Sequence, residues 1–182
     1  MKFSTSELLD ELKNRTRQHL QYAEILISKT HEELNIRPSS DSWSALECLE
    51  HLNRYGDFYI PEIKDKITAS DTTPQPFFKP GMLGNYFAKS MLPKEKLNKM
   101  KTLKVMNPIH SQLNKEVVEE FIRQQKQLLE LLEKAGNVDL QKIKTGISIS
   151  KLIRLKLGDT FRFVIYHNER HVVQAKRVLE NN

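Results

Sequence analysis

The chain has 182 residues, a formal net charge of +6, and 38% hydrophobic and 29% charged residues. This length favours one compact domain over residues 1–182, and no apolar run approaches the length of a membrane span. The N-terminal residues turn polar at once, unlike a secretory signal, so we expect a cytoplasmic protein without a membrane partner. A single cysteine, Cys48, excludes an intramolecular disulfide and a cysteine-rich zinc module. Histidine and carboxylate groups remain as metal ligands.

Apolar residues at helical spacing predict a first helix over residues 5–36, which Pro38 ends. Turn-forming residues follow, and Ser44 with Glu47 three positions later has the form of a capping box that opens a second helix. We expect this second helix to end around Ala69. Pro61 should kink or interrupt it, because proline lacks an amide hydrogen.

The character of the sequence changes between residues 70 and 114, where prolines and glycines are scattered. A loop of this length is uncommon in a compact domain, so we expect a long crossover that contains a short helix around residues 85–91. Helical periodicity resumes over residues 114–135 and again in a last helix, which Ser148 or Ser150 can cap. Because no segment shows convincing β alternation, we predict an all-α four-helix bundle with a long crossover between helices two and three.

The crossover also carries most of the excess positive charge. Between residues 79 and 104, seven lysines stand against the single acid Glu95, namely Lys79, Lys89, Lys94, Lys96, Lys99, Lys101 and Lys104. A solvated connection is the favoured interpretation, and attraction of phosphate or another anionic substrate is the alternative. Nucleic-acid binding is not favoured, because the sequence has no zinc-finger spacing, no aromatic RNA-binding strand and no helix-turn-helix motif.

His167 and His171 are one helical turn apart in the last predicted helix. Side chains at positions i and i+4 lie on one face, with Cβ atoms about 6 Å apart, so both imidazoles can reach one metal ion. The pair can also arise by chance or on a solvated face. Asn168 follows the first histidine where the zincin motif has glutamate, which argues against a metalloprotease.

A third ligand is required, because two histidines alone bind a metal ion weakly. His51 lies next to the apolar face of the second predicted helix. A buried imidazole in such a setting needs a polar partner. The three remaining histidines have mostly polar sequence neighbours, and they are His19, His31 and His110. His51 is therefore the best candidate for the third ligand.

Two short motifs surround these histidines. They are Trp43-Ser44 followed by Glu50-His51-Leu52, and His167-Asn168-Glu169-Arg170-His171 followed by Gln174. Together with the layout of helices over nearly the full chain, they resemble the DinB/YfiT-like superfamily. The resemblance implies a four-helix bundle with a long crossover. It also implies one divalent ion, zinc or nickel, held by His51 from the second helix and by His167 and His171 from the last.

Several neighbouring residues are candidates for supporting roles. For Glu47, capping the second helix is favoured over service as a fourth ligand or a base. Cys48 is expected to be a small buried apolar residue rather than a thiolate ligand. Trp43 is expected to pack at the start of the second helix, with lining of a substrate pocket as the alternative. Gln174, one turn beyond His171, is a candidate hydrogen-bonding partner of a ligand.

Three imidazole ligands leave one coordination position for water, which is typical of catalytic rather than structural zinc sites. The ion can then lower the pKa of a bound water or thiol. The resemblance implies hydrolase-like activity or the transfer of a low-molecular-weight thiol such as bacillithiol. The first hypothesis is therefore a metal-dependent enzyme of the bacterial cytoplasm acting on a small molecule, and a homodimer is compatible with it. The alternative is a non-enzymatic helical bundle that binds a ligand or partner and whose ion is structural or absent.

Overall fold

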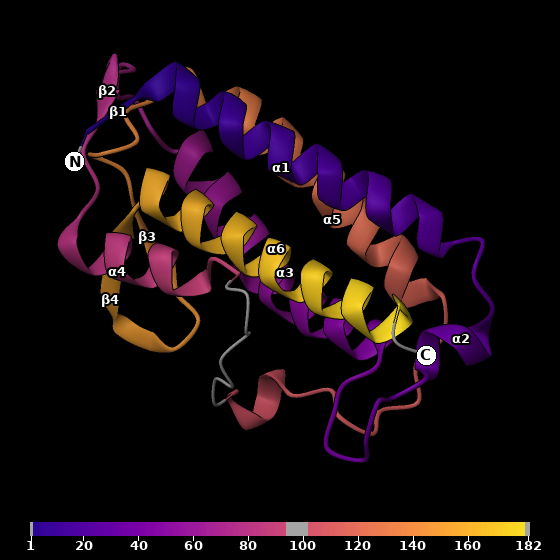
Figure 1. Ribbon diagram of the computed structural model, residues 1–182. Coiled ribbons are helices and arrows are strands. Elements are labelled where there is room, and N and C mark those ends of the chain that lie inside the picture. The colour runs from indigo at the N-terminus through magenta and orange to yellow at the C-terminus, as the bar shows by residue number, and fades with distance from the viewer. Residues whose placement is uncertain (1, 94–101, 181–182) are drawn as a thin grey trace.

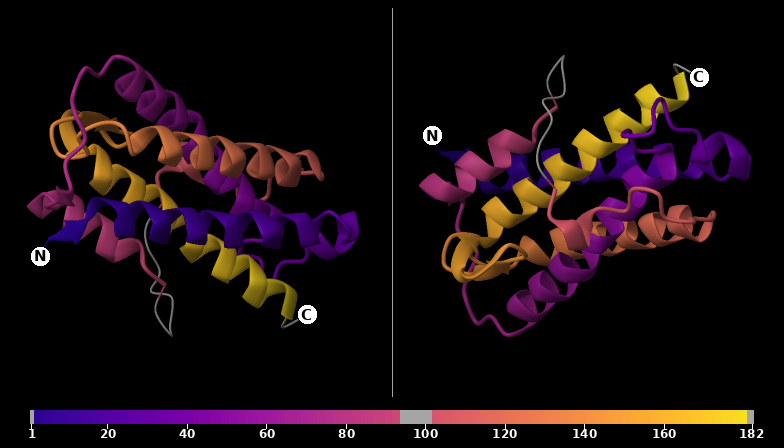
Figure 2. Two further views of the ribbon diagram at one scale, coloured as in Figure 1. Left: turned by 90° about the horizontal axis from the view of Figure 1, so that it is seen from above. Right: turned by 90° about the horizontal axis from the view of Figure 1, so that it is seen from below.

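Four long helices form most of the computed structural model, which describes residues 2–93 and 102–180 (Figure 1). They are α1 (Thr5–Leu26), α3 (Ala45–Thr68), α5 (Glu116–Ala135) and α6 (Leu157–Glu180). Helix α1 packs against α5 and α6, and α3 packs against the same two helices. The views in Figure 2 show α1 beside α5 as one layer and α3 beside α6 as the other. The fold is mostly helical, as the sequence predicts.

The first helix is shorter than expected. Helix α1 ends at Leu26, and a separate short helix, α2 (His31–Asn35), follows it. Thr30 starts this second segment, because its side chain accepts a hydrogen bond from the amide of Glu33 while the Glu33 carboxylate accepts one from the amide of Thr30. The prediction of one helix over residues 5–36 is therefore wrong in its last third. A capping box breaks the helix where apolar spacing alone suggests continuity.

Helix α3 begins as predicted. Ser44 caps it, and Ser44 and Glu47 form the expected capping box. The helix continues past Pro61 without a break and ends at Thr68, close to the predicted end. Pro61 and Asp57, whose carbonyl group would accept the missing hydrogen bond, are both exposed, so water can satisfy that carbonyl.

The long crossover between α3 and α5 is present and is partly ordered by short elements. Strand β2 (Phe77–Phe78) pairs with β1 (Phe3–Ser4), and helix α4 (Met82–Met91) and the 3-10 helix η1 (Lys104–Met106) follow. The expected short helix is confirmed, although it begins three residues earlier than predicted. Lys94, Lys96, Lys99 and Lys101 of the lysine-rich segment lie outside the described residues.

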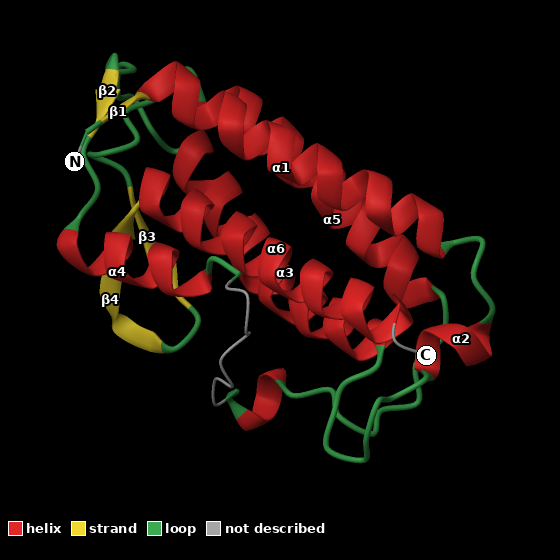
Figure 3. Cartoon of the chain, in the orientation of Figure 1, coloured by secondary structure: helices red, strands yellow, loops and turns green. Residues whose placement is uncertain are grey.

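A β-hairpin precedes the last helix, where the sequence led us to expect helix. Strands β3 (Lys144–Ile147) and β4 (Ser150–Lys156) pair antiparallel, and α6 begins only at Leu157. The predicted cap at Ser148 or Ser150 is thus wrong, and so is the expectation of a chain without a hairpin. Thr145 faces Leu155 across the hairpin and both side chains are buried, so this cross-strand pair packs into the core. Figure 3 shows β1, β2, β3 and β4 at the end of the molecule where α1 begins.

The first turns of α6 anchor the crossover. The buried carboxylate of Asp159 accepts hydrogen bonds from the Gly81 amide at 2.7 Å and from the Arg162 guanidinium at 3.1 Å. Arg162 also donates to the side-chain oxygen of Asn85 in α4 at 3.0 Å. The buried ion pair within α6 therefore holds α4 through hydrogen bonds with Gly81 and Asn85, in addition to apolar contacts.

The hydrophobic core has two clusters, and both α3 and α6 pass from one to the other. Tyr59 of α3 and Ile165 of α6 belong to the first cluster. Leu49 of α3 and Val172 of α6 belong to the second. On α6, His167 and His171 lie between the residues of the two clusters, and on α3, His51 lies beside Leu52 at the end of the second cluster. No described helix combines the length and the apolar character that a membrane crossing requires.

The close approach of α4 to α6 gives a first prediction. A Cβ atom added at Gly84 would lie 2.6 Å from Cβ, Cγ and Oδ2 of Asp159. We expect Gly84→Ala to lower the free energy of unfolding by about 1–3 kcal/mol, because overpacking outweighs the better helix propensity of alanine. Lys89→Ala, on the exposed side of the same helix, should change it by less than about 0.5 kcal/mol. Urea denaturation of both variants tests this, and a Gly84→Ala protein as stable as the wild type would contradict it.

Candidate metal centre

Three histidines that are far apart in the sequence meet where α3 packs against α6. His51 comes from α3, and His167 and His171 come from α6. Each offers one ring nitrogen, and these nitrogens all lie within 4.8 Å of one another. The side chains are buried, with exposed fractions of 2%, 6% and 8%. The structure therefore brings together all three histidines that the sequence nominates, and they can hold a metal ion.

The distance between the first two rings suits tetrahedral coordination. Nε2 of His51 lies 3.2 Å from Nε2 of His167. Two nitrogen ligands at about 2.0–2.1 Å from a tetrahedral zinc ion lie roughly 3.3–3.4 Å apart. The ring of His171 completes the triangle, with its centroid 4.6 Å from that of His51 and 4.8 Å from that of His167. The donor set thus fits a small divalent ion.

Hydrogen bonds orient two of the three rings. Nδ1 of His51 lies 2.6 Å from the backbone carbonyl oxygen of Met106. A carbonyl oxygen only accepts, so Nδ1 carries the hydrogen and Nε2 keeps its lone pair. Nδ1 of His171 lies 2.9 Å from Oε1 of Gln174 and donates in the same way. Partners of this kind fix the orientation of metal-bound histidines in known sites.

Aromatic rings surround the three histidines. The Trp43 ring centroid lies 4.7 Å from that of His51 and 5.5 Å from that of His171. The Tyr55 ring centroid lies 4.7 Å from that of His167, and the Phe163 ring stacks on the same histidine with its centroid 5.8 Å away. These three aromatic side chains are half-exposed, so they connect the buried nitrogens with the surface.

Glu47 does not join the three histidines, although it precedes His51 by one turn. Its carboxylate accepts two hydrogen bonds from the Arg37 guanidinium, at 2.9 and 2.7 Å. It also accepts hydrogen bonds from the backbone amides of Ser44 at 2.8 Å and His110 at 2.6 Å. Burial opposes its ionisation, but these hydrogen bonds outweigh burial and hold the pKa of Glu47 below its ordinary value. The capping role predicted for Glu47 is confirmed.

Cys48 also stays apart from the candidate ligands. Its side chain is completely buried within the second core cluster. Burial, followed by the nearby Glu47 charge, raises the pKa of the thiol. A thiol that stays protonated is a poor metal ligand, so Cys48 fits the predicted role of a small apolar residue.

The three clustered histidines are neutral at pH 7. Burial lowers the pKa of His51 to about 4, and the Arg54 charge acts in the same direction. Burial and then the neighbouring histidines hold the pKa of His167 well below its ordinary value. The pKa of His171 is depressed for the same reasons. The neutral imidazole is the form that binds a metal ion.

Sequence reasoning missed several residues of the site. Tyr55 lies one turn after His51, and Phe163 lies one turn before His167. Their helical spacing relative to the ligands could have identified both. The Met106 carbonyl has no such signal, because every residue carries a backbone oxygen.

A comparison with protein families agrees with this geometry. The sequence model of the DinB superfamily matches residues 8–175. The chain belongs to the DinB superfamily. Searches of curated proteins and of solved structures found no match. The predicted resemblance to the DinB superfamily is thus confirmed. The matched residues include all three clustered histidines.

The depressed histidine pKa values predict how the stability of this DinB-superfamily chain depends on pH. An unfolded histidine titrates near pH 6.5, whereas His51 titrates near 4 in the folded chain. Between these values the unfolded state binds a proton that the folded state does not. For each such histidine, the free energy of unfolding of metal-free protein should therefore fall by up to about 1.4 kcal/mol per pH unit as pH decreases.

Urea unfolding of chelator-treated protein between pH 7 and pH 4.5 measures this slope. We expect His51→Gln to reduce this slope by up to about 1.4 kcal/mol per pH unit, the contribution of one proton, because glutamine does not titrate. Equal slopes for the wild type and His51→Gln would show that His51 is not held neutral.

Proposed function

We propose that this DinB-superfamily chain is a single-domain, divalent-metal-dependent enzyme with one zinc or nickel ion held by His51, His167 and His171. The convergence of three buried, neutral imidazoles is the observation that carries the proposal. Under this proposal the four long helices form the family's four-helix bundle, and the site lies on facing helices, as is common in such bundles.

The number of ligands supports a catalytic rather than a structural ion. Structural zinc sites usually have four protein ligands, whereas catalytic sites use three and leave a position for water or substrate. Among the described residues, the group able to hold an ion consists of histidines alone. A bound ion would supply Lewis acidity and lower the pKa of a water or thiol placed there.

The surrounding residues would perform the remaining tasks. Met106 and Gln174 hold two imidazoles in the orientation that directs Nε2 toward the ion. Trp43, Tyr55 and Phe163 form an apolar, half-exposed wall that can exclude bulk water and contact a small substrate. We propose hydrolysis of a small molecule, or transfer of a low-molecular-weight thiol to a small electrophile, as a reaction of the cytoplasm.

Metal analysis tests the metal centre directly. Protein dialysed against zinc or nickel and then freed of excess metal should retain about one ion per chain. His51→Ala and His171→Ala should lose that ion, because two remaining histidines bind weakly. His31→Ala, which removes an exposed histidine outside the cluster, should retain it. A wild-type protein that takes up no divalent ion would refute the proposal.

The catalytic part needs a separate measurement. Metal-loaded protein should transfer bacillithiol to a fluorogenic electrophile or hydrolyse members of a small ester and amide panel. Chelator treatment should abolish the rate, and reloading should restore it. A wild-type protein that holds the ion but shows neither activity would favour a non-enzymatic protein with a structural ion.

A further inference from the structure

A short stretch of the crossover, residues 106–110, lies against His51 and Trp43. At its start, the Met106 carbonyl accepts the hydrogen bond from Nδ1 of His51. The next residue, Asn107, accepts a hydrogen bond from the Trp43 indole at 3.0 Å, and the Trp43 ring lies against His51. The 106–110 segment therefore contacts both a candidate ligand and the aromatic ring beside it.

The other end of the segment has an unusual backbone conformation. His110 has a φ angle of 63°, in the left-handed region that is unfavourable for residues with a Cβ atom. Its amide donates to Oε1 of Glu47 at 2.6 Å. This hydrogen bond joins His110 to the first turn of α3. His51 lies one turn further along the same helix.

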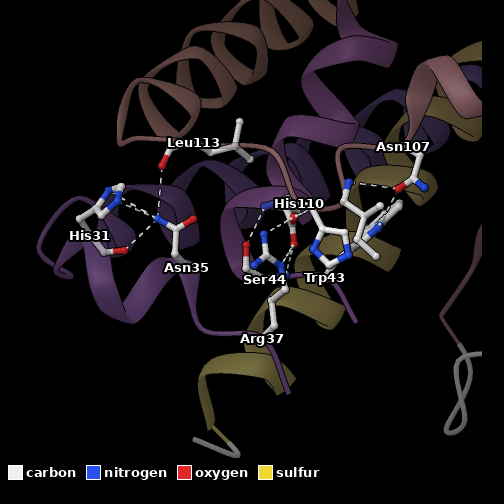
Figure 4. Close-up of polar contacts among 10 residues, drawn as sticks. His31, Asn35, Arg37, Trp43, Ser44, Asn107, His110 and Leu113 are labelled. Atoms are coloured by element: carbon white, nitrogen blue, oxygen red, sulfur yellow. Dashed lines mark hydrogen bonds and ion pairs between the residues drawn. The ribbon is translucent and has the colours of Figure 1, made fainter. Parts of the chain in front are cut away.

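Glu47 joins three parts of the chain at one carboxylate. It is completely buried, and it accepts hydrogen bonds from Arg37 after α2, from the Ser44 amide at the start of α3 and from His110 in the segment. Figure 4 shows Arg37, Ser44 and His110 gathered at this point, with the hydrogen bond between Trp43 and Asn107 next to them. A helix cap alone needs only the contacts with Ser44, so the bonds to Arg37 and His110 are additional.

We propose that Glu47 is a positioning residue of the metal centre, which holds the 106–110 segment so that Met106 orients His51 and Asn107 orients Trp43. This inference rests on the proposed function, because it assumes that the histidines bind an ion. Glu47 acts through the segment and touches none of the ligating nitrogens. Arg37 donates to both carboxylate oxygens and so fixes the direction of the carboxylate, and Oε1 accepts a second hydrogen bond from His110.

The chain contains a matched control. Glu33 occupies the same capping-box position in α2 that Glu47 occupies in α3. It likewise accepts hydrogen bonds from a basic side chain, Lys29, at 2.9 Å and from the backbone amide of the capping residue, Thr30, at 2.7 Å. Glu33→Gln therefore perturbs a more exposed cap of the same form, whose hydrogen bonds join it to Lys29 and Thr30 rather than to the 106–110 segment. Glu47→Gln perturbs the cap and the segment together.

The test compares wild type, Glu33→Gln and Glu47→Gln by zinc affinity, measured in competition with a chromophoric chelator, and by the visible spectrum of the cobalt(II)-loaded protein. We expect Glu47→Gln to bind zinc about 10–100-fold more weakly and to show a changed cobalt spectrum, the range seen when supporting residues of metal ligands are lost. Glu33→Gln should match the wild type in both. If Glu47→Gln does not fold, Arg37→Lys, which keeps the charge but not the paired hydrogen bonds, should change both readouts in the same direction.

The outcomes separate the two proposals. If the wild type and Glu33→Gln bind zinc and the folded Glu47→Gln or Arg37→Lys variant has the same affinity and cobalt spectrum, the positioning role is wrong and the metal centre stands. Equal losses in Glu33→Gln and Glu47→Gln would reduce Glu47 to a helix cap and also overturn the positioning role. Absence of zinc from the wild type would overturn both proposals.

Discussion

The contact between α3 and α6 buries three neutral imidazoles next to one another, and the rest of the candidate site is arranged around this constraint. A buried imidazole is costly unless its polar atoms have partners. His51 and His171 satisfy Nδ1 with nearby oxygens. The Nε2 lone pair of His51 then faces His167, where it can accept a hydrogen bond from that ring or bind a metal ion. The helix contact therefore prepares a ligand set rather than an ordinary apolar interface.

The irregular crossover contributes as much to this arrangement as the helices do. Its first half is held against α6 by the buried pair of Asp159 and Arg162. Its second half supplies the Met106 carbonyl and the Asn107 acceptor beside the histidines. Long loops on a rigid helical scaffold often carry function for this reason, since they can present backbone groups that a helix keeps for its own hydrogen bonds.

The parts of the fold and site that sequence reasoning found are those governed by local spacing. Two histidines four residues apart on a helix must share a face, and Ser44 with Glu47 forms the cap that its pattern indicates. The joining of His51 to the other two depended on resemblance, because no local rule relates residues more than a hundred positions apart. The convergence in the folded chain provides the missing tertiary information.

The errors also have physical causes. Thr30 and Glu33 have the same capping form as Ser44 and Glu47, but they lie inside a pattern of apolar spacing that suggested one continuous helix. The hairpin over residues 144–156 is short and irregular, with a register shift after Gly146, so its alternation is weak. The role of Met106 depends on where the crossover runs, which only tertiary packing determines.

Anomalous diffraction from crystals of the zinc-loaded protein, recorded at the zinc edge, tests the central claim most directly. We expect one strong peak about 2.0–2.1 Å from Nε2 of each of His51, His167 and His171. A strong peak held by other residues, or no peak at the three histidines in protein that retains zinc, would contradict it.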